Sequence, residues 1–105
     1  MPKLFEYLGI IVLFYSNEHE PVHVHGKYQG HESKAEFEIV DGRVTAIHIV
    51  NVRGRRPLPP AQLKEFRHLV RVFADDIVQK WIDYFVYHRD IRCITIEGKL
   101  NDSRR

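Results

Sequence analysis

The stretch KAEFEIVDGRVTAIHIV, residues 34–50, decides the fold of the first half of the chain. Charged and apolar side chains alternate from Lys34 to Val40, which is the period-two pattern of a half-buried strand. The pair Asp41-Gly42 follows and favours a two-residue type I′ hairpin turn. Residues 43–52 then return as the next strand, so this part of the chain is predicted to be an antiparallel hairpin.

This turn also predicts which residues lie opposite one another. If the two residues that flank the turn are partners, Phe37 opposes Ala46 and Ala35 opposes His48. His48 would then lie among apolar side chains, which favours a hydrogen-bonded core histidine over a ligand. A slip of one residue would exchange the two faces of the strand.

The preceding segment, residues 22–28, alternates in the same way and predicts another strand of the meander. If Tyr28 opposes His31 across the intervening turn, His23 opposes Glu36. His23 and His25 are two residues apart, so their side chains project from the same face of the sheet.

Further elements lie on both sides of this meander. Residues 8–15 are β-branched and aromatic, which predicts a first strand buried on both faces. Pro59-Pro60 suits the start of a helix, and an apolar stripe at helical spacing runs from Leu63 to Tyr84. One straight helix of that length would exceed the diameter of a small domain, so we expect a break or kink near residues 74–76.

A capping box formed by Asp76 and Gln79 would begin the second helical segment. Residues 91–96 alternate again and predict a last strand that contains Cys93 as a small core residue. The prediction is an α+β fold, with an antiparallel β-meander of about four strands, then a long kinked helix or two helices, then a C-terminal strand. Residues 1–100 are expected to form a single domain and residues 101–105 a disordered tail.

Composition narrows the class of protein. The chain has 105 residues, a formal charge of +2 and one cysteine, which excludes an internal disulfide and favours a reducing compartment. No apolar run is long enough to span a bilayer. The run at residues 8–15 is followed by polar residues rather than by a signal-peptide cleavage site. We therefore expect a cytoplasmic protein without a membrane partner.

Positive charge is concentrated in the middle of the chain. Residues 43–71 contain seven basic residues and one acidic residue, a local balance of +6. Arg53, Arg55 and Arg56 lie in a proline-rich connection inside this segment, and they are the candidate residues for binding a phosphate backbone. The alternative is a solvated basic face without a ligand.

Histidines are concentrated in one short segment, where His19, His23, His25 and His31 account for four of the seven. Three neutral imidazoles suit zinc or another divalent metal, so His19, His23 and His25 are the candidate ligands. Glu36, on the neighbouring strand, would then orient one ring from the second coordination shell.

Two other interpretations of these histidines stay open. Imidazole titrates near neutral pH, so His23 and His25 could act as catalytic general base and general acid in phosphodiester cleavage. An arginine of the basic connection would stabilise the charge that develops on phosphorus. The histidines could also be purely structural.

Several stretches resemble a family of small bacterial proteins, the domain of unknown function 4160. The most specific is the string H-x-P-x-H-x-H-G at residues 19–26, and the others are Met1-Pro2, Gly9-Ile10-Ile11, residues 14–18, Leu63-Lys64-Glu65-Phe66 and residues 80–85. Together they cover roughly residues 1–85. The family usually has a second proline where this chain has Val22, and the three histidines are retained.

This resemblance implies a prokaryotic source, and it points to His19, Pro21, His23 and His25 as the family's shared residues. Members are often encoded beside another small protein in what resembles a toxin–antitoxin arrangement. The leading hypothesis is therefore a toxin–antitoxin component that binds or acts on RNA or DNA, with a cognate protein partner. The alternative is a metal- or ligand-binding regulatory or protein-interaction module without catalysis, and a homodimer is compatible with either.

Overall fold

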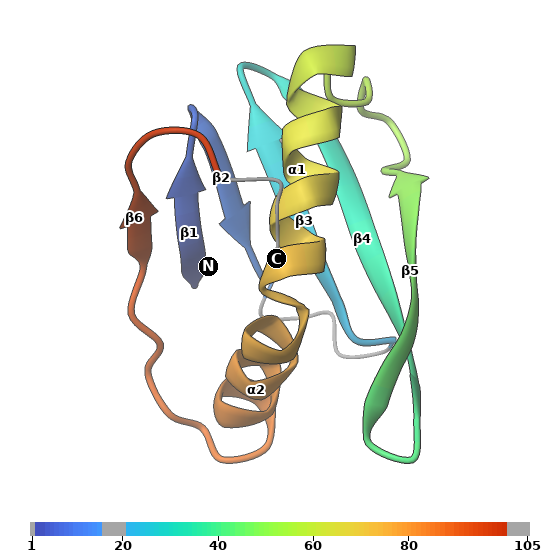
Figure 1. Ribbon diagram of the computed structural model, residues 1–105, viewed down its shortest axis with the longest axis vertical. Helices are drawn as coiled ribbons and strands as arrows, with labels where there is room; N and C mark the ends of the chain where they lie inside the picture. The colour runs from blue at the N-terminus through green and yellow to red at the C-terminus, as the bar shows by residue number, and fades with distance from the viewer. Residues whose placement is uncertain (1, 16–20, 101–105) are drawn as a thin grey trace.

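The computed structural model describes residues 2–15 and 21–100. Its centre is a six-stranded sheet with the strand order β5-β4-β3-β2-β1-β6, and two helices complete the fold (Figure 1). The elements are β1 (Lys3–Tyr7), β2 (Ile10–Leu13), β3 (His23–Tyr28), β4 (His31–Val40), β5 (Arg43–Asn51), α1 (Pro60–Val72), α2 (Ala74–Phe85) and β6 (Ile94–Ile96). The predicted α+β class, with a meander before the helices and a strand after them, is confirmed.

Three tight turns connect the strands of the meander. The central pairs Leu8-Gly9, Gln29-Gly30 and Asp41-Gly42 all have positive φ, between 46° and 83°, as a type I′ turn requires. The turn at Asp41-Gly42 was predicted, but the single first strand at residues 8–15 is wrong. The chain reverses at Leu8-Gly9 between β1 and β2, and leucine is not a residue that favours positive φ.

The β3–β4 register agrees with the prediction, since Tyr28 opposes His31 and His23 opposes Glu36. The β4–β5 register is shifted by one residue between Glu38 and Ile39, so Ala35 opposes Ile49 rather than His48. Phe37 likewise opposes Ile47 and not Ala46. A bulge of this kind moves every later side chain of one strand to the other face.

His48 is therefore not a core residue, contrary to the prediction. It opposes Glu36 on the face of the sheet away from α1, and its side chain is about half exposed, at 53%. Its Nε2 lies 2.9 Å from the Glu38 carboxylate.

The helical half has the predicted break. Pro59 and Pro60 begin α1, the helix ends at Val72, and α2 starts at Ala74 after the non-helical Phe73. The predicted capping box is wrong, because Asp76 lies inside α2 and the N-cap has no side-chain hydrogen bond. Gln79 instead donates a hydrogen bond to the carboxylate one turn further along the helix.

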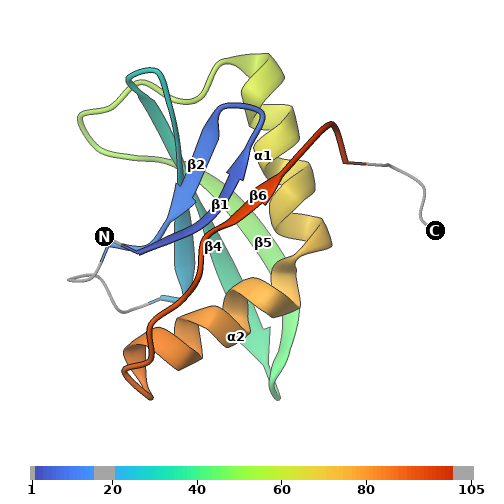
Figure 2. The same ribbon diagram turned by 90° about the vertical axis from the view of Figure 1, so that its left-hand side faces the viewer.

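The last strand joins the sheet beside β1, to which it is parallel (Figure 2). It is shorter than predicted, since it covers Ile94–Ile96 and leaves Cys93 just outside, partly exposed. Burial raises the pKa of the Cys93 thiol, and the nearby Glu6 carboxylate adds to the shift, so the thiol stays protonated near neutral pH.

The core lies between the two helices and one face of the sheet. Phe66, Leu69 and Val70 are buried on α1, and Ile77 and Trp81 on α2. No helix within the described ranges is long and apolar enough to cross a membrane. Gly26 on β3 allows α1 to pack closely on the sheet, because a Cβ atom there would lie 2.7 Å from the Phe66 ring. The glycine of the histidine string is thus required by packing.

We predict that Gly26→Ala lowers the free energy of unfolding by about 1–3 kcal/mol, because the added methyl group overpacks the Phe66 contact. Urea unfolding measures the change. In a Phe66→Leu background, which leaves more room, the same substitution should cost less. An equal cost in both backgrounds would show that the Phe66 contact is not the cause.

Candidate functional site

A buried carboxylate lies near the start of β4, on the sheet face that points away from α1. Glu32 is only 2% exposed, and it accepts hydrogen bonds from three side chains. The Tyr15 hydroxyl and His25 Nδ1 each lie 2.9 Å from Oε2, and Arg55 Nε lies 3.1 Å from Oε1. We call Tyr15, His25, Glu32 and Arg55 the Glu32 cluster.

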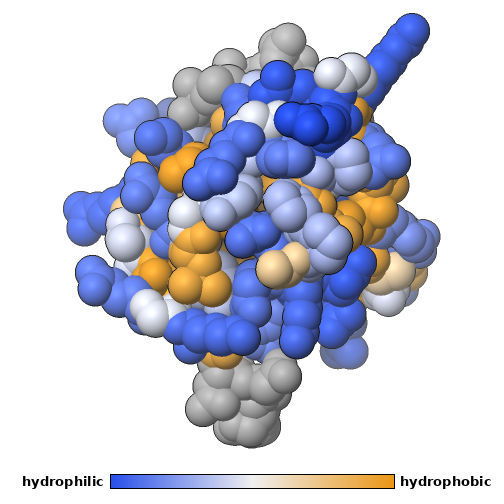
Figure 3. Space-filling view, turned by 90° about the horizontal axis from the view of Figure 1, so that it is seen from above, coloured by the Kyte–Doolittle hydropathy of each residue, from blue (hydrophilic) through white to orange (hydrophobic). Residues whose placement is uncertain are grey.

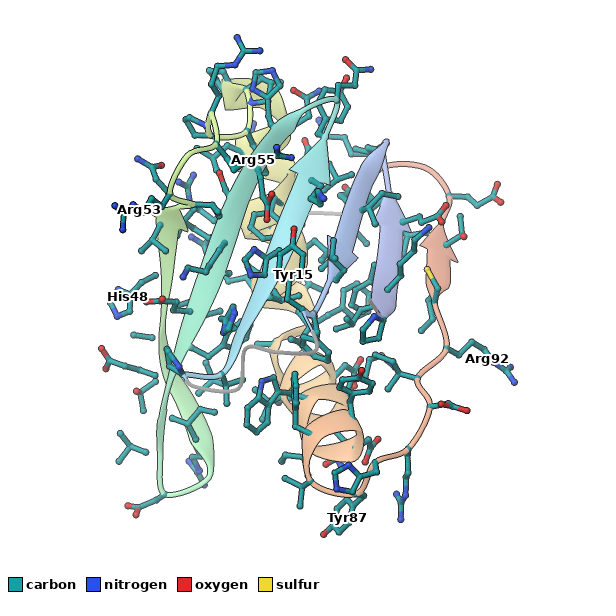
Figure 4. The ribbon with its side chains drawn as sticks, turned by 180° about the vertical axis from the view of Figure 1, so that it is seen from behind. Tyr15, His48, Arg53, Arg55, Tyr87 and Arg92 are labelled. Atoms are coloured by element: carbon teal, nitrogen blue, oxygen red, sulfur yellow. The ribbon has the colours of Figure 1, made fainter. Side chains whose placement is uncertain are left out.

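Four separate parts of the chain supply this cluster. Tyr15 follows β2, His25 lies on β3 and Glu32 lies on β4. Glu32 pairs with Lys27, which points to the same face as His25 because the two are two residues apart on β3, so His25 and Glu32 share one face of the sheet. Arg55 comes from the connection between β5 and α1. Figure 4 shows Tyr15 and Arg55 over this open face of the sheet.

Besides the Arg55–Glu32 contact, three hydrogen bonds fasten the basic connection to the start of β4. The Glu32 amide donates to the Arg56 carbonyl at 2.8 Å, and the Leu58 amide donates to the Ser33 hydroxyl at 3.1 Å. His31 Nδ1 lies 3.0 Å from the Pro57 carbonyl and donates to it. These contacts fix the loop that carries Arg53 and Arg55 beside the histidines.

The two strand histidines have fixed ring orientations. His25 Nδ1 donates to the Glu32 carboxylate, and His23 Nδ1 donates to the Pro21 carbonyl at 2.6 Å, because both partners are acceptors. The ring centroids are 5.1 Å apart in an edge-on arrangement, and the Tyr15 ring packs edge-on against His25 at 4.3 Å. The Nδ1 atom of each histidine is thus held by an oxygen of the protein, which fixes the plane of both rings.

A shallow pocket of about 470 Å³ opens over the Glu32 cluster. Its lining consists of Tyr15, His25, Lys27, Glu32, Val52, Arg53 and Arg55. With His25 neutral, three cations and one carboxylate give this lining a charge of +2. Such a pocket attracts anions.

The structure brings the two predicted groups of residues together. His25 lines the same pocket as Arg53 and Arg55, although the sequence separates them by about 30 residues. Arg56 contributes its carbonyl to Glu32, and its exposed side chain is not part of the pocket lining. Figure 3 shows that hydrophilic side chains dominate the end of the molecule where this connection enters α1.

Of the three predicted metal ligands, only His23 and His25 lie within the residues that the structure describes. His19 lies outside them, and residues 2–15 and 21–100 contain no group of three histidine, cysteine or acidic side chains that could hold a metal ion. Glu36 opposes His23 in the sheet, and its carboxylate lies 3.4 Å from Lys34 Nζ. The carboxylate that orients His25 is Glu32, and not Glu36.

Sequence reasoning did not single out Glu32 or Tyr15. The β3–β4 register contained a signal for Glu32, because pairing Tyr28 with His31 also pairs Lys27 with Glu32, on the face of His25. Tyr15 carried no such signal, since its strand was misassigned.

We predict that Glu32→Gln destabilises the fold by about 1–3 kcal/mol, because the amide cannot accept all three hydrogen bonds and leaves a buried donor unsatisfied. Thermal and urea unfolding measure the effect. Glu36→Gln is the matched control, since its partly exposed ion pair with Lys34 should contribute less than about 0.5 kcal/mol. Equal effects of the two substitutions would contradict a central role of Glu32.

Comparison with known proteins gives one match. No curated protein and no solved structure matches the chain. The family described as "Domain of unknown function (DUF4160)" matches residues 9–82, a range that includes the histidine string, the Glu32 cluster and both arginines of the pocket. Since this range is well over half of the 105 residues, the chain belongs to the DUF4160 family.

Proposed function

We propose that the chain binds the phosphate backbone of a nucleic acid in the pocket over the Glu32 cluster. The observation that supports this most is the shared pocket itself. His25 comes from β3 and the arginines from the basic connection, yet one bound phosphate could contact both. Phosphodiester chemistry needs cations and titratable groups within reach of one phosphate group.

The hydrogen bond to Glu32 orients the Arg55 guanidinium for phosphate binding. A guanidinium has five N–H donors in a fixed plane, and the bond to Glu32 uses the one at Nε. The buried carboxylate thus holds the plane in place, while the side chain remains 42% exposed. The terminal N–H groups favour bidentate binding of a phosphate.

The shape of the pocket favours a polymer over a small anion. It is an open hollow on a broad sheet face, and Lys27 and Arg53 extend the positive charge beyond Arg55. Tyr15 adds an aromatic ring to the same lining, with Lys27 Nζ 5.8 Å from its centroid. Aromatic and cationic side chains in one groove are typical of single-stranded nucleic-acid binding.

RNA cleavage is the chemistry that this arrangement would support. His25 would act as the general base that takes the proton of a 2′-hydroxyl, with its ring oriented by Glu32. The 2′-oxygen would bond to phosphorus, and the bond from phosphorus to the 5′-oxygen would break, with the imidazolium form of His23 giving a proton to the leaving oxygen. Arg55 would stabilise the charge on the phosphoryl oxygens.

We further propose that this activity belongs to one component of a toxin–antitoxin pair in the cytoplasm. The family membership and the basic pocket support this assignment. A cognate protein would then regulate access to the nucleic acid.

A short single-stranded RNA should bind more weakly as salt rises. Arg53→Ala and Arg55→Ala should each lower the affinity, and each should reduce the slope of log K against log salt by about 0.7 for every phosphate that the variant no longer neutralises. Arg92→Ala is the control, because this exposed arginine lies near β6, at the other side of the sheet (Figure 4). Fluorescence anisotropy measures all four proteins.

Absence of RNA binding at low salt would overturn the proposal, as would an equal loss of affinity in the Arg92→Ala control. If RNA binds but stays intact, while Arg53→Ala and Arg55→Ala weaken it, binding stands and the cleavage step is wrong.

A metal-binding regulatory module is the second candidate. The paired rings of His23 and His25 favour it, because both Nδ1 atoms are used in hydrogen bonds that fix the rings, as is usual for histidines that bind metal through Nε2. His19 would be a third ligand for zinc. Elemental analysis of untagged protein tests this candidate, with stoichiometric metal expected in the wild type and none in the His23→Ala, His25→Ala variant.

A further inference from the structure

One edge of the sheet lies beside a basic groove. β5 is the last strand at this edge, and within the described residues it pairs with β4 alone. It covers nine residues, so it presents a long row of backbone N–H and C=O groups on its outer side. Such an edge is a template for another strand.

The groove runs between β5 and α1. Two hollows of about 420 Å³ each follow the strand, one along residues 44–47 and the other along residues 47–50. They share Ile47 and Arg71, so they form one continuous groove. Figure 1 shows α1 in front of the sheet and β5 at its outer edge.

The helix side of this groove has a net positive charge, because Arg67 and Arg71 outnumber Asp75, which lines the same side at the start of α2. Arg67 and Arg71 come from successive turns of α1 and line the groove. The acidic residue of α1, Glu65, is already used, since it accepts from the Tyr7 hydroxyl at 3.0 Å and lies 3.3 Å from Lys99 Nζ. An occupant of the groove therefore meets an open backbone edge on one side, and two arginines and one aspartate on the other.

We propose that β5 binds an extended, acidic segment of a protein partner, which adds to the sheet as a further strand. Main-chain hydrogen bonds to β5 would supply affinity, and acidic side chains facing α1 would pair with Arg67 and Arg71. The alternate side chains of the added strand would point to the opposite face of the sheet, away from α1. There they would lie beside Ala46 and Val50, whose partners on β4 are Glu38 and Lys34.

Charge argues against a second copy of this chain as the occupant. Antiparallel pairing of β5 with itself about a twofold axis normal to the sheet would place both α1 helices on the same face, and Arg67 and Arg71 of the two copies would approach one another. Like charges across an interface oppose association. This surface is independent of the pocket over the Glu32 cluster, which no residue of α1 lines.

The test uses a short synthetic peptide that alternates glutamate with valine, and a matched peptide that alternates lysine with valine. The acidic peptide should bind the full-length protein, and the lysine peptide should not. Hydrogen exchange followed by NMR should show slower exchange at alternate amides of β5, which is the signature of an added strand. Arg67→Glu and Arg71→Glu should each weaken binding about tenfold, and the distant Arg92→Glu should not.

Binding without protection of the β5 amides would overturn strand addition, and absence of binding would overturn the proposal as a whole. A single-stranded RNA provides the remaining comparison. If it protects β5 and loses affinity in Arg67→Glu, while the acidic peptide does neither, this groove is a nucleic-acid surface and the proposal is wrong.

Discussion

The carboxylate of Glu32 is the group on which the open face of this sheet depends. A buried charge is costly unless it is paired and hydrogen-bonded, and Glu32 meets both conditions through Tyr15, His25 and Arg55. Each donor comes from a different part of the chain, so satisfying one carboxylate fixes the relative positions of β2, β3 and the basic connection. The same contacts create the pocket, because they hold a cation and an imidazole side by side.

The histidine string serves the core and the open face at once. Because strand residues alternate, Val24 and Gly26 face α1, while His23 and His25 face away from it. Gly26 lets the Phe66 ring approach the sheet, and His25 binds Glu32. The spacing of the string therefore has a physical reason on both faces, and neither reason requires a metal ion.

The sequence predicted the fold correctly where a turn has a strong local sequence signal, and incorrectly where that signal is weak. Asp41-Gly42 is a strong turn signal and was correct, whereas Leu8-Gly9 is a weak one, and missing it merged β1 and β2 into one strand. The bulge opposite Glu38 left no mark in the alternation of residues 34–50, so His48 was assigned to the wrong face. Bulges depend on contacts across strands, which a single sequence does not show.

The candidate site was predicted in its parts but not in its assembly. His25 and Arg55 were both singled out, yet only the folded chain shows that Glu32 joins them. A glutamate after a turn is ordinary in a sequence, and its importance comes from burial. The structure also separates two basic surfaces that the sequence presented as one charged segment, namely the pocket over the Glu32 cluster and the groove beside β5.

The central claim is that His25 and Arg55 form one phosphate-binding unit through Glu32. An NMR titration of ¹⁵N-labelled protein with a short single-stranded RNA tests it most directly, by following the ring nitrogens of His25 and the Nε–H of Arg55. The account predicts that both signals move together, with the same dissociation constant, and that Glu32→Gln uncouples them. RNA binding that moves the Arg55 signal and leaves His25 unchanged in the wild type would contradict it.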